Sequence, residues 1–385
     1  MGLIKILKNT EYGMKLREKL YLRYSPEPRL RNLFEKAMKR FRECKVKKNP
    51  SDIRAEIHAY KKFWRCYPYD YFIYDLYRSD RPLTQDEIIN YIPDFFWFKL
   101  FLPHYTSYKC SPITDNKIIS EHFFHSLNIP QPTTLFRIIN GNLYSPQMQR
   151  YTYNQMQHEL ADNHYEKLFV KPVESGGGMG IYIFHRNCSG SYTTHENLIF
   201  DELFLSNIGK TKDYVVQSGV IQDQRILKIY PGSVNTCRIV TENKDGKSCA
   251  VCGMLRIGRN QNEIDNASAG GIFLKIDIDS GKVGDHAFSY EYEKFSEHPD
   301  THFVFHNFEI PRWNDIRKLA TVSASKFPFF AHLGWDIALT ANGPLVIETN
   351  LSPGIGSLQI SHEGLREKFG IDDPDYYWKN RGKRE

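Results

Sequence analysis

The segment that constrains the fold most runs from Trp335 to Asn350, where two apolar stretches flank a turn-forming Asn342-Gly343. Such a pair between two apolar stretches is typical of a β-hairpin. If residues 341–343 form a three-residue loop, Asp336 on the first strand faces Glu348 on the second, and Asn350 shares their face because side chains alternate along a strand. A two-residue loop would shift this register by one residue and separate the two acids.

Two facing carboxylates need a physical reason. The Cβ atoms of residues that face each other in such a pair lie about 4.5–5.5 Å apart, and like charges at that distance are destabilising. A divalent cation would remove the repulsion, and oxygen ligands from two carboxylates and an amide suit a Mg²⁺ ion that bridges phosphates. The alternative is an exposed acid pair on an edge hairpin, which the apolar neighbours Ile337 and Val346 disfavour.

Residues 168–184 form a second informative segment, in which an apolar strand with Lys171 and Pro172 is followed by a loop with glycines at 176, 177, 178 and 180 and by another strand. Glycine allows backbone amides to approach phosphates closely. The lysine supplies a point charge for phosphate oxygens. On its own, this segment is equally consistent with a flexible hairpin tip that carries a surface lysine.

The rest of the chain predicts an α+β protein, because mostly antiparallel strands alternate with helices after residue 165. Apolar spacing and turn formers predict helices near 10–23, 28–47, 51–66, 117–127, 150–164, 195–205 and 313–326. They predict strands near 134–139, 143–145, 214–218, 233–241, 248–258 and 272–278, with an Asn140-Gly141 turn between the first two. The alternating residues 302–306 also suggest a strand, which disfavours a metal role for His302 and His306.

Four regions are expected along the chain. They are a helical, basic and aromatic N-terminal region (1–105), a linker and central subdomain (106–165), a nucleotide-binding and catalytic region (166–362) and a polar C-terminal tail (363–385).

Charge is distributed unevenly. Residues 1–65 hold 19 basic and 7 acidic residues, a balance of +12, whereas the whole chain carries +6. This basic segment could contact a membrane surface, an anionic substrate or nucleic acid, although a solvated helix face is the simpler reading. The sequence has no secretory signal, and its seven cysteines show no zinc or disulfide spacing. We therefore expect a cytoplasmic protein, with contact at the inner membrane face left open and no nucleic-acid partner.

The order of several short motifs resembles that of the ATP-grasp superfamily. Lys171-Pro172 with its glycine loop precedes the hairpin that carries Asp336 and Glu348-Thr-Asn350. The motifs between them are Asn235-Thr-Cys-Arg238, Arg256-Ile-Gly258, Asp265-Asn266 and Gly270-Gly271. More narrowly, residues 110–362 resemble the sugar-transfer-associated ATP-grasp proteins of surface-polysaccharide loci. This resemblance implies two α+β subdomains that clasp ATP, behind a helical N-terminal extension.

The resemblance also implies roles for individual residues, with ATP and Mg²⁺ as the cofactors. The implied nucleotide contacts are Lys117, Lys171, Ser175, Gly176, Gly177, Gly178, Met179, Gln217, Ser218 and Val220. The implied metal ligands are Asp336, Glu348 and Asn350. Arg238 and Arg256 would stabilise the γ-phosphate or an acyl-phosphate, and a structural salt bridge is the alternative for each. Gln217 stands where many members have a glutamate, which leaves the ribose contact open, with Asp223 as a weak substitute.

The function that the resemblance implies is an ADP-forming carboxylate–amine ligase that works through an acyl-phosphate. The family's setting suggests small-molecule substrates, an amino acid or small amine and a sugar acid or sugar nucleotide, in capsule or O-antigen assembly. A sugar kinase on the same fold and a non-catalytic nucleotide-binding scaffold are the alternatives. A P-loop is excluded, because the sequence has no G-x-x-x-x-G-K-[ST] motif.

Overall fold

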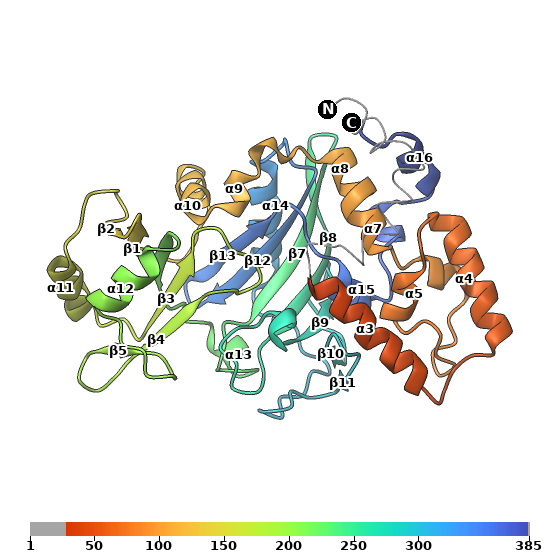
Figure 1. Ribbon diagram of the computed structural model, residues 1–385, viewed down its shortest axis with the longest axis horizontal. Coiled ribbons are helices and arrows are strands. Elements are labelled where there is room, and N and C mark those ends of the chain that lie inside the picture. The colour runs from red at the N-terminus through yellow and green to blue at the C-terminus, as the bar shows by residue number, and fades with distance from the viewer. Residues whose placement is uncertain (1–27, 384–385) are drawn as a thin grey trace.

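Two antiparallel sheets form the framework of the protein, whose structure is a computed structural model that describes residues 28–383. Within these residues the first sheet has six strands in the order β2-β1-β6-β3-β4-β5. They are β1 (Thr134–Ile139), β2 (Asn142–Tyr144), β3 (Lys167–Pro172), β4 (Tyr182–Arg186), β5 (Tyr192–Thr193) and β6 (Tyr214–Ser218). In Figure 1 this sheet lies on the left, beside α11 (Tyr153–Asn163) and α12 (Glu202–Gly209).

The second sheet lies at the centre of Figure 1 and, within the same residues, has seven strands in the order β11-β10-β9-β8-β7-β12-β13. Its long strands are β7 (Thr236–Lys244), β8 (Lys247–Ile257), β12 (His332–Thr340) and β13 (Gly343–Asn350). Its shorter strands are β9 (Ile272–Ile276), β10 (Ala287–Phe288) and β11 (Lys294–Phe295). The order places β7 between β8 and β12, so residues that are distant in sequence become neighbours at the middle of the sheet.

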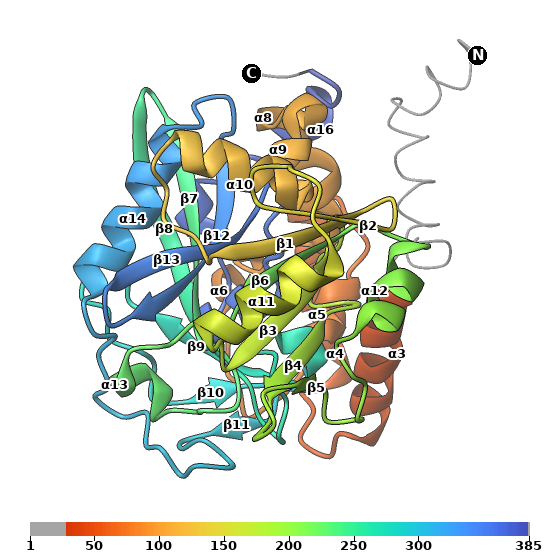
Figure 2. The same ribbon diagram turned by 90° about the vertical axis from the view of Figure 1, so that its left-hand side faces the viewer.

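The seven-stranded sheet is covered on both faces. Along β8, Leu255 packs in a core with Ile316 and Ala320 of α14 (Trp313–Ser325), and the preceding residue, Met254, packs in a second core with the N-terminal helices. Figure 2 shows α14 running alongside β7 and β8. Burial on both faces explains why β12 reads as an apolar run, since every residue from His332 to Leu339 is buried.

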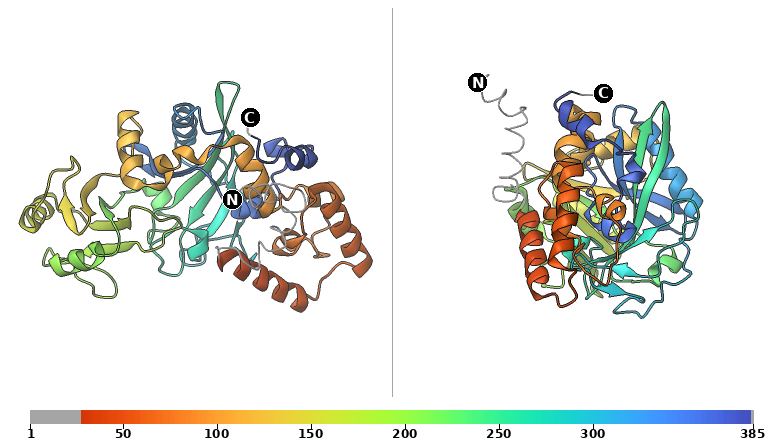
Figure 3. Two further views of the ribbon diagram at one scale, coloured as in Figure 1. Left: turned by 45° about the horizontal axis from the view of Figure 1, so that its top comes forward. Right: turned by 90° about the vertical axis from the view of Figure 1, so that its right-hand side faces the viewer.

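A third block, on the right of Figure 1, consists of helices from both ends of the described chain, and Figure 3 shows the same arrangement from two further directions. The N-terminal helices are α3 (Pro28–Glu43), α4 (Pro50–Trp64), α5 (Tyr69–Ile73), α6 (Gln85–Ile89), α7 (Asp94–Phe96), η1 (Trp97–Phe101) and α8 (Leu102–Tyr105). They are followed by η2 (Tyr108–Cys110) and α9 (Pro112–Asp115). The C-terminal helices are α15 (Gly356–His362), η4 (Glu367–Phe369) and α16 (Pro374–Lys379).

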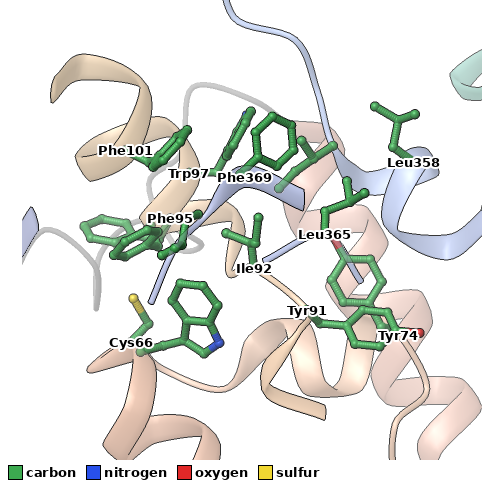
Figure 4. Close-up of a cluster of buried hydrophobic side chains, with 14 of the residues drawn as sticks. Cys66, Tyr74, Tyr91, Ile92, Phe95, Trp97, Phe101, Leu358, Leu365 and Phe369 are labelled. Carbon is green, nitrogen blue, oxygen red and sulfur yellow. The ribbon is translucent and has the colours of Figure 1, made fainter. Parts of the chain in front are cut away.

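The C-terminal segment packs in the core of this block and does not behave as a polar tail. Leu365 and Phe369 lie among Ile92, Phe95 and Trp97 in Figure 4, and all of these side chains are buried. The indole Nε1 of buried Trp378 donates to the backbone oxygen of Trp64 at 2.9 Å. The expected region boundaries stay predictions, but Leu365, Phe369 and Trp378 are part of the folded core.

Most of the expected elements are present, with shifted ends. The predicted helix at 117–127 is α10 (Lys117–Ser126), and Asn140-Gly141 forms the turn between β1 and β2. The helix expected at 195–205 begins later, because the Asp201 side chain caps α12 by accepting from the Phe204 amide at 2.8 Å. The strand expected at 302–306 is wrong, since this stretch is mainly turn and loop. The helix expected at 10–23 lies outside the described residues.

Within residues 28–383, no helix combines the length and apolar character needed to cross a bilayer.

Candidate active site

A cleft between the two sheets gathers most of the residues singled out from the sequence. It is bounded by β3 and β6 on one side, by β7, β8, β12 and β13 on the other, and by the start of α10. The predicted residues that line it are Lys117, Lys171, Ser175, Gly177, Gly178, Ser218, Val220, Arg238, Arg256, Asp336, Glu348 and Asn350. Gly176, Met179 and Gln217 are not among its lining residues, and Met179 is 71% exposed.

Two lysines enter the cleft from different elements. Lys171 lies on β3, and its Nζ donates to Oε1 of Gln217 on β6 at 2.9 Å. Lys117 is the first residue of α10, and its Nζ donates to the backbone oxygen of Ser175 at 2.8 Å. Burial, with the nearby charge of Lys117, lowers the pKa of Lys171 to about 8, and burial also lowers the pKa of Lys117. Two desolvated ammonium groups side by side favour an anionic ligand.

The glycine-rich loop reaches from β3 towards the seven-stranded sheet. Gly177, Gly178 and Gly180 have φ values of 67°, 78° and 73°, a left-handed conformation that side chains other than glycine rarely adopt. A Cβ atom on Gly178 would lie 3.2 Å from Cγ2 of Ile264, which belongs to the loop between β8 and β9. The backbone conformation and the position of this loop are thus those expected of a segment that covers the cleft.

The hairpin of β12 and β13 has Asp336 opposite Glu348, and Asn350 opposite Gly334. The predicted pairing of the acids is confirmed, but the predicted three-residue loop is wrong. Thr340 pairs with Gly343, which leaves a two-residue turn, and a bulge at position 347 restores the register before Glu348. Bulges often lie beside active sites because they redirect side chains. Here the bulge keeps both acids at the cleft.

Asp336 is held by two arginines, one from the adjacent strand β7 and one from β8, the next strand in the sheet. Arg238 on β7 donates to both of its carboxylate oxygens, the Nη2–Oδ2 distance being 2.8 Å. Arg256 on β8 donates from Nη1 to Oδ2 at 3.0 Å and from Nη2 to Oδ1 of Asp265 at 2.6 Å. Burial raises the pKa of Asp336, but the charges of both arginines outweigh burial and leave that pKa below its ordinary value.

Glu348 has a different electrostatic environment. Burial and the charge of Asp336 raise its pKa, although Lys117 and the two arginines act in the opposite direction. Beside it, the amide nitrogen Nδ2 of Asn350 is buried and has no hydrogen-bond partner. An acid with a raised pKa and an unpaired buried amide are features expected where a ligand completes the site.

The donor set fits Mg²⁺. Asp336, Glu348 and Asn350 offer hard oxygen donors on one hairpin, as this ion prefers. Oδ1 of Asp336 accepts from Arg238 and keeps a second lone pair, so the arginine clamp and a cation are compatible.

Of the nucleotide contacts predicted at the end of β6 and just after it, only some line the cleft. Ser218 and Val220 line the cleft. The Gln217 side chain instead accepts a hydrogen bond from Lys171 and donates from Nε2 to Oγ1 of Thr134 at 3.3 Å. Asp223 is bound to Arg225, with a 2.8 Å contact between Oδ2 and Nη2, and is not among the lining residues. Asp223 is thus not a candidate for the ribose contact.

Sequence reasoning gave no role to several residues that build the site. Buried Asp265 accepts from the backbone nitrogen of Thr236 at 3.1 Å and from its hydroxyl, and thereby orients Arg256. Further lining residues without a predicted role are Pro132, Phe169, Ile181, Val234, Glu263, Ile264 and Ile347. The signal for Asp265 was present in the Asn/Asp/Gly-rich loop 259–271, because such a loop places polar groups at the end of β8.

Two sheets that enclose a cleft with cations and facing acids define an α+β fold with a polar site between the sheets, and comparison with known proteins identifies its family. Residues 99–370 match the family model described as sugar-transfer associated ATP-grasp. The chain therefore belongs to this family and has the ATP-grasp fold, as the sequence motifs predicted. A search of curated proteins found no match.

Solved structures with similar folds are distant. D-alanyl-alanine synthetase A from Vibrio cholerae aligns with 14% identity and a TM-score of 0.39, over 70% of this chain and 66% of that one. D-alanine–D-alanine ligase from Bacillus anthracis gives 14% identity and a TM-score of 0.37, over 71% of each chain. L-amino acid ligase from Bacillus licheniformis gives 13% identity and a TM-score of 0.39, over 77% of this chain and 52% of that one. The chain thus spans less than two thirds of the first and third of these structures, and likenesses of this size say nothing about its substrates.

Proposed function

We propose that the protein is an ATP-dependent, ADP-forming carboxylate–amine ligase. The observation that carries this proposal is that two lysines and two arginines meet two facing acids in a single cleft. Phosphoryl transfer needs positioning and charge neutralisation more than it needs a protein nucleophile, and this site is built for both.

In this proposal each cation has a separate task. Lys117 and Lys171 hold the α- and β-phosphates, because they lie beside the glycine loop that covers the cleft. Arg238 and Arg256 face the γ-phosphoryl group and the acyl-phosphate, for which a planar guanidinium suits bidentate contacts. Their contacts with Asp336 and Asp265 fix both arginines before substrate binds, which removes the reorganisation cost at the moment of reaction.

Asp336, Glu348 and Asn350 would hold Mg²⁺. When bound, this ion neutralises charge on the β- and γ-phosphate oxygens. A cation beside Glu348 would lower the pKa of this acid, against the burial and the Asp336 charge that raise it.

The proposed reaction has two steps. A substrate carboxylate oxygen attacks the γ-phosphorus, and the bond to the β-phosphate oxygen breaks, which gives an acyl-phosphate and ADP. An amine nitrogen then attacks the acyl carbon, phosphate leaves, and the amine loses a proton as the amide forms. No protein thiol is required, and Cys237, next to Arg238 in sequence, is unsuited to attack because burial raises its pKa to about 12.

The substrates that we propose are a sugar acid or sugar nucleotide as the carboxylate and an amino acid or small amine as the acceptor. The family's description, sugar-transfer associated, supports a role in the assembly of capsule or O-antigen polysaccharide. The basic N-terminal region would face an anionic substrate or the inner membrane surface in a cytoplasmic enzyme.

The test is to incubate the protein with Mg·ATP and pools of uronic acids and amines, and to follow phosphorus species by ³¹P NMR. ADP and free phosphate that form only when both pools are present support the ligase. A stable sugar phosphate formed without the amine pool would replace the ligase with a kinase on the same fold. The absence of turnover with every pool, despite ATP binding, would favour a nucleotide-dependent scaffold.

A further inference from the structure

Three potential metal ligands from separate segments meet at the edge of the cleft. His185 lies on β4, His195 follows β5, and Glu263 belongs to the loop between β8 and β9. One ligand atom of each lies within 4.8 Å of the others. Nε2 of His185 is 2.9 Å from Oε1 of Glu263, and Nε2 of His195 is 3.2 Å from Oε2.

We propose that His185, His195 and Glu263 form a binding site for a divalent transition-metal ion, with Zn²⁺ as the probe. Two imidazole nitrogens and a carboxylate oxygen are a common three-ligand set for this ion. Donor atoms around a tetrahedral Zn²⁺ lie about 3.3 Å apart, close to the two histidine–carboxylate separations in this cluster. His195 is 69% exposed, so the fourth position is open to water. This site is distinct from the all-oxygen set on the β12–β13 hairpin.

A simple histidine–carboxylate ion pair is the competing explanation, and the same protein shows what such a pair looks like. His302 lies 2.8 Å from Glu297, and His306 lies 2.9 Å from Asp285, each carboxylate with one histidine and both partners on the surface. Glu263 differs because two histidines converge on it and its side chain is only 13% exposed. The ring centroids of the two histidines are 4.6 Å apart, so both imidazoles lie close to the same carboxylate.

Lys167 is the competitor for the ion. Its Nζ lies 2.9 Å from Oε1 of Glu263, and its side chain is 35% exposed, so it can turn into solvent when a cation binds. Its positive charge opposes a second cation at the same carboxylate. Replacing it with a neutral residue should therefore strengthen metal binding, whereas a structural role for Lys167 alone would not produce that effect.

The site would join the two halves of the cleft. His185 and His195 belong to the six-stranded side, whereas Glu263 extends from the seven-stranded sheet. The next residue, Ile264, lines the cleft and lies against Gly178 of the glycine loop. A bound ion would hold residues 259–266 against β4 and restrain the cover of the cleft. This inference does not depend on the proposed ligase activity.

The experiment is a Zn²⁺ titration by calorimetry of the full chain, with the exposed Cys188 and Cys249 changed to serine in every variant. The background protein should bind one equivalent that is lost in His185→Ala/His195→Ala and in Glu263→Gln, which keeps the side-chain shape. The matched control, His302→Ala/His306→Ala, should keep that equivalent, and Lys167→Gln should bind it more tightly. Equal Zn²⁺ affinity in the background protein, His185→Ala/His195→Ala and Glu263→Gln would overturn the proposal.

Hydrogen exchange supplies a second readout that needs no catalysis. Zn²⁺ should slow amide exchange in residues 259–266 of the background protein and have no such effect in His185→Ala/His195→Ala. Slowing of the same size in both proteins would overturn the proposal, since the ion would then act elsewhere.

Discussion

Asp336 and Glu348 lie directly opposite each other on β12 and β13, yet the arginines that reach this pair both bind Asp336. The pKa of Asp336 is lowered by these arginines despite its burial, whereas the pKa of Glu348 is raised by burial and by its neighbour's charge. Both arginines thus hydrogen-bond Asp336, whereas they and Lys117 act on Glu348 through their charges. Glu348 is the acid whose charge is left for a bound cation.

Replacement of Glu348 with glutamine should separate stability from activity. The change removes a destabilising like-charge contact, so the Tm should equal or exceed that of the native protein. Turnover of Mg·ATP should fall by at least about 100-fold, because a ligand of the Mg²⁺ that neutralises the developing phosphate charge is lost. The control is Glu309→Gln, an exposed acid 3.6 Å from Lys282, which should keep both properties. Undiminished ATP consumption in Glu348→Gln would contradict the metal assignment.

Arg256→Ala should be strongly destabilising, because Arg256 is buried and bridges Asp265 and Asp336. Its removal leaves two buried carboxylates without their shared partner, a loss of about 3–5 kcal/mol. Urea unfolding followed by tryptophan fluorescence measures the loss. The control is Arg225→Ala, because the Arg225 side chain is 57% exposed and its removal should leave the unfolding free energy nearly unchanged. Equal stability of the two variants would show that the network does not support the fold.

The facing acids could be predicted because the alternation of side chains along a strand is a local property. The predicted register is correct because two differences from the prediction cancel. The loop was predicted one residue too long, and the bulge at Ile347 adds the missing residue on β13. The arginine clamp could not be predicted in the same way. Arg238 and Arg256 reach Asp336 only because β7 lies between β8 and β12, and that strand order depends on packing across the whole sheet.

The prediction of a polar C-terminal tail was wrong for the opposite reason, because the local composition of this segment is misleading. Its charged residues concealed Leu365, Phe369 and Trp378, which lie in the core of the helical block. Whether these residues are buried depends on Trp64 and Trp97, which lie far away in the sequence. Composition within a window could not reveal that contact.

Nucleotide binding should take up protons near pH 8. Lys171 has a pKa lowered to about 8 by burial and by Lys117, so it is charged below that pH and neutral above it. Phosphates favour the charged form, and binding at pH 8 should therefore take up about half a proton per nucleotide at this residue. Calorimetry in two buffers of different ionisation enthalpy measures the uptake. At pH 6.5 the uptake should be much smaller, and in Lys171→Arg it should decrease at pH 8, because arginine stays charged. Uptake that is unchanged in Lys171→Arg would contradict the assignment.

Gly178→Ala should impair the cover of the cleft more than Gly176→Ala does. Gly178 has φ of 78°, and a Cβ atom there would meet Ile264 at 3.2 Å, whereas no atom lies within 4 Å of a Cβ on Gly176. The substitution at 178 thus adds backbone strain of about 1–2 kcal/mol and obstructs the approach of the loop to the opposite sheet. ATP affinity, measured by calorimetry with Mg²⁺ present, should fall about 5–30-fold in Gly178→Ala and less in Gly176→Ala. The two positions lie in one loop and differ in φ and in the room for a Cβ atom. Equal losses of ATP affinity in the two variants would therefore show that loop closure over the nucleotide does not involve Ile264.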